Sequence, residues 1–371
     1  VPDENAAAAC CYTSGTTGNP KGVIYSHRTI YLHSLASMAA NAFGLSDRDR
    51  IMLLPPMFHA NAWGLPFSGW LAGSDFVLPG AHLQAPAIQR MIAETAPSFT
   101  ATVPTILNEL LRADALSPIN MSSFRTIVCG GSAVAERLIV DVEERWAVPL
   151  IQGWGMTETS PLCVLSHPAA DTTGAEAHRL QSKSGRPVAG VEVRILDDNG
   201  ERLSEDGIVV GRLQLRGPWI ARGYHGVGDV LTDDGWLDTG DAGTIDDRGY
   251  VQVTDRLKDL IKSGGEWISS AELENYISGL PGINEAAVIA VPDERWEERP
   301  LAIVTSETSV TPDWALLRSQ LATRVARFWV PEYWAHVEKL PLTGVGKVDK
   351  LALRQQVESG SMQYLRVDIP A

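Results

Sequence analysis

Several features are scarce in this chain of 371 residues, and each absence narrows the class of protein. The 4 cysteines (Cys10, Cys11, Cys129 and Cys163) include no Cys-x-x-Cys pair and lie mostly in apolar stretches, which predicts buried free thiols in a reducing compartment. No uninterrupted apolar run approaches the roughly 18 residues that a membrane span needs, so we expect no transmembrane segment. The chain also contains no internal repeat and no low-complexity segment.

Positive charge is also scarce, because 31 Lys and Arg stand against 45 Asp and Glu and give a net charge of −14. Nucleic-acid binding without sequence preference needs a basic face, so we expect no nucleic-acid partner. The start, Val1–Asn5, is polar, and the alanine run after it is too short for the apolar core of a secretory signal. The 44% hydrophobic and 20% charged residues are typical of a soluble globular protein, and we expect a cytoplasmic location.

Hydrophobic patterning predicts an α/β sheet in the first part of the chain. The expected elements, in order, are a buried strand at 6–12, a helix at 27–42, a strand at 51–54, helices at 85–96 and 104–115, and a strand at 126–129. Because strands alternate with helices, parallel pairing is expected.

The second part of the chain has a different pattern. Apolar and polar residues alternate at 191–196 and 209–215, with a turn rich in Asp, Asn and Gly between them, which predicts a hairpin in a small β unit at 185–255. Beyond it we expect an α+β arrangement, with a helix at 271–278, a strand at 285–291, a helix at 311–326 and a strand at 333–337. The prediction is therefore two domains, residues 1–255 and residues 256–371.

One loop is dense in groups that bind phosphate. Residues 12–22 have the sequence Tyr-Thr-Ser-Gly-Thr-Thr-Gly-Asn-Pro-Lys-Gly. The N–H groups and hydroxyls of such a loop can surround a polyphosphate, while Lys21 supplies a positive charge. The spacing differs from the Walker pattern, in which Ser or Thr follows the lysine, because Gly22 follows Lys21 here. Clusters of Gly, Ser and Thr also occur in ordinary loops, which is the alternative interpretation.

A second segment, residues 152–161, has the sequence Gln-Gly-Trp-Gly-Met-Thr-Glu-Thr-Ser-Pro. Two glycines flank Trp154, so the backbone and the flat ring can approach a planar ligand closely. Thr157 can donate a hydrogen bond to a phosphate, and Glu158 offers a hard oxygen ligand suited to Mg²⁺. A simple capped loop is the alternative for this pattern when it stands alone.

Two further turns each present one charged residue. Asp241 ends the segment 236–241, and a Thr-Gly turn holds it where it could accept hydrogen bonds from both ribose hydroxyls of a nucleotide. An Asx turn without a ligand is the alternative. Lys347 lies in the glycine-rich segment 341–350, where a lysine is ordinarily a solvated surface charge.

Together these segments resemble, in the expected order, the motifs of the adenylate-forming superfamily, which includes acyl-CoA synthetases, nonribosomal peptide adenylation domains and beetle luciferases. The resemblance covers essentially the whole chain. It implies a large N-terminal α/β domain with a small β unit, followed by a mobile α+β C-terminal lid domain. Trp154, where the family often has Tyr, and the segments 265–270 and 293–300 resemble the branch that activates medium-chain fatty acids or 3-methylthiopropionic acid.

The resemblance also implies ligands and roles: ATP with Mg²⁺, CoA and a small-molecule carboxylic acid. Nucleotide and cofactor binding falls to Thr13, Ser14, Gly15, Thr16, Thr17, Gly18, Lys21, Gly131, Ser132, Gly153, Trp154, Gly155, Asp241, Arg256, Gly264 and Gly265. Catalysis falls to Lys347, Thr157 and Glu158, with Glu158 also the metal ligand. The acyl pocket would include His59, Trp63, Gly131 and Gly155.

Lys258 matches the position about which the family's C-terminal domain turns between two half-reactions. That rotation would remove Lys347 from the site and bring in the turn at Gly264 and Gly265 to line the pantetheine tunnel. The corner that contains His59 and Trp63 is otherwise more typical of a core. Relatives that activate amino acids place an aspartate near this corner, and none lies between residues 57 and 67, which favours an uncharged acyl tail.

The largest departure from the family is at the start, because its members carry a substantial region before the phosphate loop, which begins here at Thr13. We therefore expect an incomplete N-terminal domain. The predicted function is an ATP-dependent carboxylic acid–CoA ligase that acts through an acyl-adenylate. The alternatives are an adenylation domain that loads a carrier protein and an inactive nucleotide-binding fragment. A homodimer is one assembly that the sequence leaves open.

Overall fold

The computed structural model describes residues 3–13, 20–306, 312–342 and 348–367. The chain divides into two compact units: unit 1 comprises residues 1–239 and 243–253, and unit 2 comprises residues 240–242 and 254–371. Within the described ranges, no helix is long and apolar enough to cross a bilayer.

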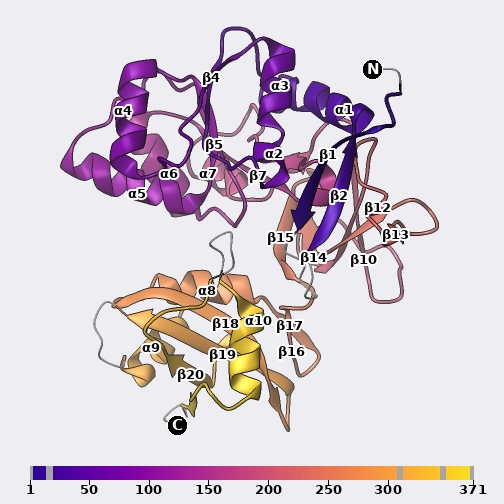
Figure 1. Cartoon of the computed structure of the whole chain (residues 1–371). Coiled ribbons are helices and arrows are strands. Elements are labelled where there is room, and N and C mark those ends of the chain that lie inside the picture. The colour runs from indigo at the N-terminus through magenta and orange to yellow at the C-terminus, as the bar shows by residue number, and fades with distance from the viewer. Residues whose placement is uncertain (1–2, 14–19, 307–311, 343–347, 368–371) are drawn as a thin grey trace. The chain divides into compact units, whose positions relative to one another are not determined.

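Unit 1 is built around a 7-stranded sheet with the order β4-β3-β5-β6-β7-β8-β9 (Figure 1). The strands are β3 (Arg50–Leu53), β4 (Asp75–Val77), β5 (Phe99–Thr102), β6 (Thr126–Cys129), β7 (Leu150–Gly155), β8 (Leu162–Leu165) and β9 (Arg186–Pro187). Pairing is parallel from β4 to β7 and antiparallel from β7 to β9. The predicted α/β fold with parallel pairing is therefore confirmed.

The helices of unit 1 are α1 (His27–Met38), α2 (Ala60–Trp63), α3 (Leu65–Ala72), α4 (Ala85–Thr95), α5 (Pro104–Leu116), α6 (Glu136–Trp146) and α7 (Gly174–Gln181). Successive strand residues enter different cores, since side chains alternate along a strand. Ile127 and Leu150 pack in the core that contains apolar residues of α4, α5 and α6. Their neighbours Val128 and Ile151 pack in the other core, against residues of α1 and α3.

The first strand differs from its prediction. β1 (Ala7–Thr13) pairs antiparallel with β2 (Lys21–Ser26), and both belong to a separate 4-stranded sheet with β12 (Gly223–Tyr224) and β13 (Gly228–Asp229). The prediction of a buried strand is wrong, because Cys11 is the one fully buried residue of β1 in this structure. All four cysteines are free, but Cys10 is exposed, so the prediction of buried thiols holds for three of them.

The small β unit has the strand order β10-β11-β14-β15. Its strands are β10 (Glu192–Leu196), β11 (Gly211–Arg216), β14 (Leu237–Ile245) and β15 (Val251–Arg256). β10 and β11 pair antiparallel, which confirms the predicted hairpin. Its turn is built by Asp197, whose carboxylate accepts hydrogen bonds from the backbone N–H groups of Asn199 and Glu201.

Unit 2 is a 6-stranded sheet with helices on it (Figure 1). The elements are β16 (Ile261–Ser263), β17 (Glu266–Ile268), α8 (Ser270–Ser278), β18 (Ile283–Asp293), β19 (Glu297–Ser306), α9 (Trp314–Leu321), β20 (Tyr333–His336), α10 (Lys350–Glu358) and β21 (Leu365–Arg366). The main path is β17-β16-β19-β20-β21, and β18 pairs antiparallel with β19. The predicted helix at 311–326 is shorter, because the Asp313 side chain caps its start at the N–H of Leu316 and the helix ends at Leu321.

Alternate residues of β18 again serve two cores. Ala286 and Val288 pack with Leu273 and Ile277 of α8, whereas Ala287 and Ile289 pack on the opposite face, in the core that contains Leu353 of α10. The sheet thus separates α8 and α9 from α10, which fixes where α10 lies.

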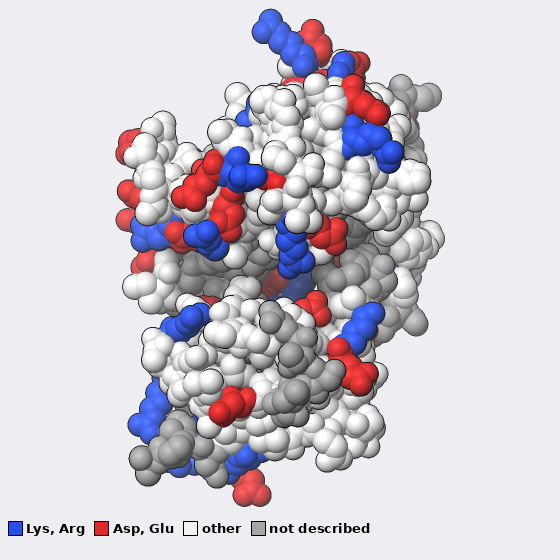
Figure 2. All heavy atoms as spheres, turned by 90° about the vertical axis from the view of Figure 1, so that its left-hand side faces the viewer, with Lys and Arg blue, Asp and Glu red and all other residues white. Residues whose placement is uncertain are grey.

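Charged side chains of both signs are interspersed on the face in Figure 2, where red and blue groups lie beside one another. Ion pairs join several of the chain's charged side chains, such as Arg212 with Asp238 and Arg216 with Glu192. Among the described residues on the displayed face, blue groups gather into no extended basic patch of the kind that would bind a phosphate backbone.

Candidate functional site

The segment that follows β7 is a tight turn that requires glycine. A Cβ atom on Gly155 would lie 1.9 Å from the carbonyl oxygen of Pro161, closer than any side chain can approach. The chain then enters a short 3-10 helix at Thr157–Thr159. The two residues that the sequence predicts to bind phosphate and metal, Thr157 and Glu158, are both buried there.

Two tyrosines from other strands hold this turn. The hydroxyl of Tyr25, on β2, donates a buried hydrogen bond of 2.7 Å to the carbonyl oxygen of Thr157. The hydroxyl of Tyr224, on β12, donates to Oε1 of Glu158 at 2.6 Å. Burial, together with nearby Cys11 and Glu158, raises the pKa of Tyr25, so its phenol stays protonated and remains a donor. Neither tyrosine is predictable from a local sequence pattern, because each reaches the turn through the pairing of β2 with β12, which joins distant segments.

Lys21 lies over the ring of Tyr224. Its ammonium group is 5.0 Å from the centre of the Tyr224 ring, a cation–π distance, while the hydroxyl of the same tyrosine contacts Glu158. The structure therefore brings Lys21 and Glu158, predicted from separate motifs, to one side chain, with Lys21 over its ring and Glu158 at its hydroxyl. Thr13 ends β1, and the other predicted phosphate-loop residues, 14–18, lie outside the described residues.

The predicted acyl-pocket residues lie partly together. An added Cβ on Gly131 would lie 3.6 Å from the Trp63 ring, and one on Gly130 would lie 2.7 Å from the carbonyl oxygen of Gly153. Trp63 therefore lies against the glycine turn that follows β6. Ser132, in the same turn, is exposed.

Residues 60–63, assigned to α2, form a left-handed turn. Ala60, Asn61, Ala62 and Trp63 all have positive φ, between 46° and 60°. Runs of left-handed residues other than glycine are strained and persist only where surrounding contacts hold them. One such contact is the Cys11 thiol, which donates to Oδ1 of Asn61 at 3.3 Å. His59 precedes this turn without a capping hydrogen bond from its side chain, and no sequence pattern predicted the left-handed conformation of the turn.

His33 is a buried residue that the sequence analysis did not single out. It lies on α1, and its Nε2 accepts a hydrogen bond of 3.2 Å from the N–H of Leu162, which follows the Thr157–Glu158 turn. An added Cβ on Gly64 would lie 2.7 Å from the ring, so the ring is closely packed. Burial lowers the pKa of His33 to about 3, so the ring is neutral and can act as an acceptor.

In unit 2, the two residues predicted to contact ribose form an ion pair. Nε of Arg256 lies 2.9 Å from Oδ1 of Asp241, and the Asp241 side chain is 3% exposed. Arg256 ends β15, and Asp241 lies within β14. The structure therefore joins two positions that are 15 residues apart in the chain through one contact.

The predicted hinge and glycine turn also lie in unit 2. Lys258 is exposed, as expected, and desolvation of its ammonium group, together with the nearby cations Arg354, Arg256 and Lys350, lowers its pKa. Gly264 and Gly265 have φ of 62° and 88° and form the turn between β16 and β17. A Cβ on Gly264 would lie 2.7 Å from the Trp296 ring, so glycine is required there. Lys347 lies outside the described residues.

Glu158 offers the kind of single carboxylate through which magnesium can bind. Across the part of the chain that the structure describes, no group of three or more His, Cys, Asp or Glu side chains could hold a metal ion. Mg²⁺ commonly binds through one or two carboxylates and completes its shell with substrate phosphates and water. Glu158, a single buried carboxylate oriented by Tyr224, is suited to that arrangement.

Comparison with known proteins identifies the class. Residues 1–225 match the AMP-binding enzyme family, and residues 272–347 match the C-terminal domain of AMP-binding enzymes. The chain therefore belongs to the AMP-binding enzyme family, and the resemblance inferred from its motifs is confirmed.

The chain is also similar to individual proteins with known names. The chain is 43% identical to 3-methylmercaptopropionyl-CoA ligase of Ruegeria pomeroyi and 42% identical to medium-chain-fatty-acid–CoA ligase of Ectopseudomonas oleovorans, in each case over 95% of the chain and 66% of the relative. The chain thus spans slightly less than two thirds of their length. Among solved structures, ATP-bound MatB from Rhodopseudomonas palustris matches with a TM-score of 0.84 and 27% identity, over 96% of this chain and 69% of that one.

Proposed function

We propose that this chain carries the active site of an ATP-dependent carboxylic acid–CoA ligase that works through an acyl-adenylate. The observation that carries the proposal is the Thr157–Glu158 turn, which Tyr25 and Tyr224 hold beside Lys21. The two relatives named as CoA ligases support the choice of reaction.

The reaction consists of two displacements. In the first, a carboxylate oxygen of the acid attacks the α-phosphorus of ATP, the bond from that phosphorus to the bridging oxygen breaks, and pyrophosphate leaves. In the second, the CoA thiol loses its proton, its sulfur attacks the acyl carbon, and AMP leaves with the oxygen that linked it to the acyl group. Such steps depend mainly on positioning and on stabilisation of negative charge.

The unit 1 residues would act on the phosphates and the acid. Lys21 would neutralise charge on the β- and γ-phosphates, Thr157 would donate to the α-phosphate, and Glu158 would hold Mg²⁺. When bound, the metal would supply positive charge against the phosphates. Trp63 and Gly131 would form walls of the acyl pocket.

The unit 2 residues would act on the ribose and on the change between half-reactions. Asp241 would accept hydrogen bonds from the ribose hydroxyls, with Arg256 beside it. Lys347 would bridge the attacking carboxylate and the α-phosphate as charge develops in the first step. We propose that the residues from 256 onward form a lid that turns about Lys258, after which the turn at Gly264 and Gly265 would face the thiol.

For the acid, we propose a medium-chain fatty acid or 3-methylthiopropionic acid. The names of the two relatives support this range, and so does the lack of an aspartate at residues 57–67 that could pair with a substrate ammonium group. The free thiols of all four cysteines fit a reducing compartment such as the cytoplasm. For the assembly we propose a homodimer, and the sedimentation coefficient of the purified chain would test it.

The test is hydroxylamine-trapped adenylation, with pyrophosphate release as the readout, over acids from acetate to palmitate and including 3-methylthiopropionate. We expect turnover within one window of chain length and transfer to free CoA. Transfer to a carrier protein in preference to CoA would support the alternative adenylation domain. ATP binding with no turnover on any acid would contradict ligase activity of this chain and leave a nucleotide-binding fragment.

A further inference from the structure

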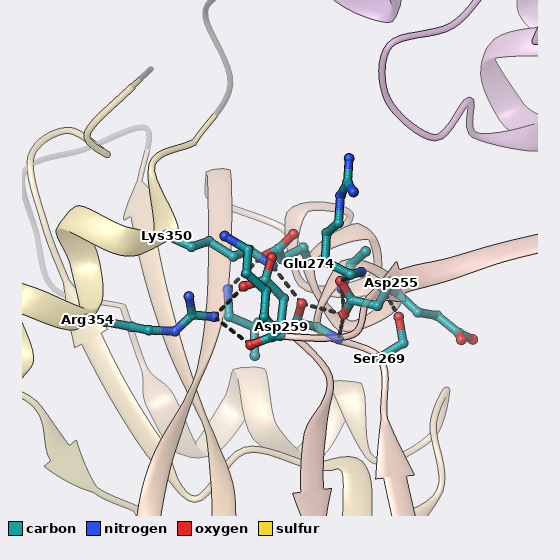
Figure 3. A network of polar contacts seen from close by, with 12 residues as sticks. Asp255, Asp259, Ser269, Glu274, Lys350 and Arg354 are labelled. Carbon is teal, nitrogen blue, oxygen red and sulfur yellow. Dashed lines mark hydrogen bonds and ion pairs between the residues drawn. The ribbon is translucent and has the colours of Figure 1, made fainter. Parts of the chain in front are cut away.

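A buried polar network in unit 2 joins α10 to the segment that carries Arg256. Figure 3 shows Lys350 and Arg354, both on α10, beside this segment. Lys350 contacts a partner of Asp255, and Arg354 contacts Asp259 directly. The two cations are four residues apart, the spacing that places side chains on one face of a helix. The two carboxylates flank residues 256–258, which include the proposed ribose-binding arginine and hinge lysine.

Lys350 forms the first part of the network. Its Nζ lies 2.7 Å from Oε1 of Glu274 and donates to the Ser270 hydroxyl at 2.6 Å. Glu274 also accepts a hydrogen bond of 2.7 Å from the N–H of Val288, so this carboxylate bridges α8, β18 and α10. The Lys350 side chain is 14% exposed, which makes the contact far less screened by water than a surface ion pair.

Ser270 connects Lys350 to Asp255. Its hydroxyl donates to Oδ2 of Asp255 at 2.5 Å, and the same oxygen accepts from the N–H groups of Ser270 at 2.6 Å and Ala271 at 3.3 Å. These N–H groups belong to the first turn of α8, where a carboxylate is electrostatically favoured. The next residue is Arg256, whose guanidinium meets Asp241.

Arg354 holds the other side of the segment. It forms an ion pair with the buried Asp259 and also donates to the carbonyl oxygen of Lys258 at 3.4 Å. Both ends of residues 255–259 are therefore fixed to α10, one through Ser270 and one directly. Removing Arg354 would leave the buried Asp259 short of its partner. Removing Lys350 would take the cation from Glu274 and from the Ser270 hydroxyl that donates to Asp255.

We propose that Lys350 and Arg354 are positioning residues for the nucleotide ribose in the conformation that the structure shows: through Asp255 and Asp259 they hold Arg256 in the orientation that meets Asp241. This inference rests on the proposed role of Asp241 and Arg256 in ribose binding. Neither cation needs to touch the nucleotide. Instead, they would orient the contact between Arg256 and Asp241, which does meet the nucleotide. Supporting partners orient the ligands of a metal site in the same way.

The test compares dissociation constants of the full chain for Mg·ATP and Mg·2′-deoxy-ATP, measured by titration calorimetry. The wild-type chain should prefer ATP, and Asp241→Ala should abolish that preference. Lys350→Met and Arg354→Met should each weaken ATP binding about tenfold while changing 2′-deoxy-ATP binding much less, because the loss falls on the ribose contact. Lys350→Arg and Arg354→Lys should restore part of the preference, since the charge is retained.

The matched control is Arg366→Met, which removes another cation of unit 2 from an ion pair with Glu332 at a 59% exposed site. It should leave both dissociation constants unchanged. If Lys350→Met does not fold, Ser270→Ala interrupts the same relay by the loss of one hydroxyl and should also lower the preference for ATP.

The outcomes separate the inference from the function on which it rests. If Asp241→Ala abolishes the preference but Lys350→Met and Arg354→Met keep the wild-type ratio, the positioning role is overturned and the ribose role stands. If Asp241→Ala keeps the preference, the ribose role fails and the inference fails with it. Turnover is not needed for either result, so an inactive ligase would not confuse the two.

Discussion

Replacement of Tyr224 by Phe removes one hydroxyl and tests how Glu158 is held. The ring, its packing and its 5.0 Å approach to Lys21 would remain, while the 2.6 Å hydrogen bond to Oε1 of Glu158 would be lost. Glu158 is 6% exposed, so water cannot fully replace the missing donor. A hydrogen bond to a charged group contributes about 1.5–3 kcal/mol, which corresponds to about a ten- to 150-fold change in an equilibrium constant.

We expect the loss of this hydrogen bond to weaken the binding of Mg²⁺. The phenol orients the carboxylate that would hold the metal, and loss of such a supporting partner typically costs about 10–100-fold in metal affinity. The assay is pyrophosphate release as a function of Mg²⁺ at saturating ATP and acid. The half-saturating Mg²⁺ concentration should rise by about that factor, whereas the rate at saturating Mg²⁺ should change little.

The matched control is Tyr25→Phe, which removes the donor to the Thr157 carbonyl oxygen but leaves Glu158 with its partner. It should lower the melting temperature without a selective effect on Mg²⁺ dependence. An unchanged or lower Mg²⁺ requirement in Tyr224→Phe would refute the reasoning, because the phenol would then be irrelevant to the metal or would compete with it.

Three further predictions concern other parts of the chain. Gly155→Ala should destabilise unit 1 by more than about 2 kcal/mol, since its Cβ would lie 1.9 Å from the Pro161 oxygen. Urea unfolding measures this, with Gly279→Ala as the comparison, because a Cβ there would meet its nearest atom at 3.5 Å. His33, with its pKa lowered to about 3, binds a proton in the unfolded chain at a higher pH than in the folded one. The free energy of unfolding that the neutral ring contributes should therefore be fully present above about pH 6.5. It should fall by up to about 1.4 kcal/mol per pH unit toward pH 3, and His33→Gln should remove this slope. Lys347→Ala should lower adenylate formation by at least about 100-fold yet spare thioester formation from supplied acyl-AMP, and an equal loss of both steps would contradict its proposed role.

Local patterns were sufficient to predict the elements whose contacts are local in character. The alternating residues of β10 and β11 and the Asp197 turn between them follow directly from side-chain periodicity and turn chemistry. The parallel strands β3 and β6 were predictable for a similar reason, because each is a short apolar run that prolines or glycines follow.

Features that depend on a distant segment were not predictable from one sequence. β1 has an apolar composition typical of a buried strand, but its partner β2 lies across the phosphate loop and leaves most of its residues exposed. The left-handed turn at 60–63 has no glycine within it, so its conformation depends on surrounding contacts rather than on local preference. Tyr25 and Tyr224 resemble ordinary strand residues until their hydroxyls are seen to meet the Thr157–Glu158 turn.

The same distinction explains how the candidate site is built. Each motif supplies a group that meets a ligand, but the group that fixes its orientation comes from elsewhere: Tyr224 orients Glu158, and the α10 network would orient Arg256. A motif therefore specifies which chemistry is available, whereas the supporting contacts decide whether that chemistry is aligned within the short distances that catalysis requires. Substitutions at the supporting positions should consequently change metal or nucleotide affinity selectively, while substitutions within the motifs should remove a chemical step.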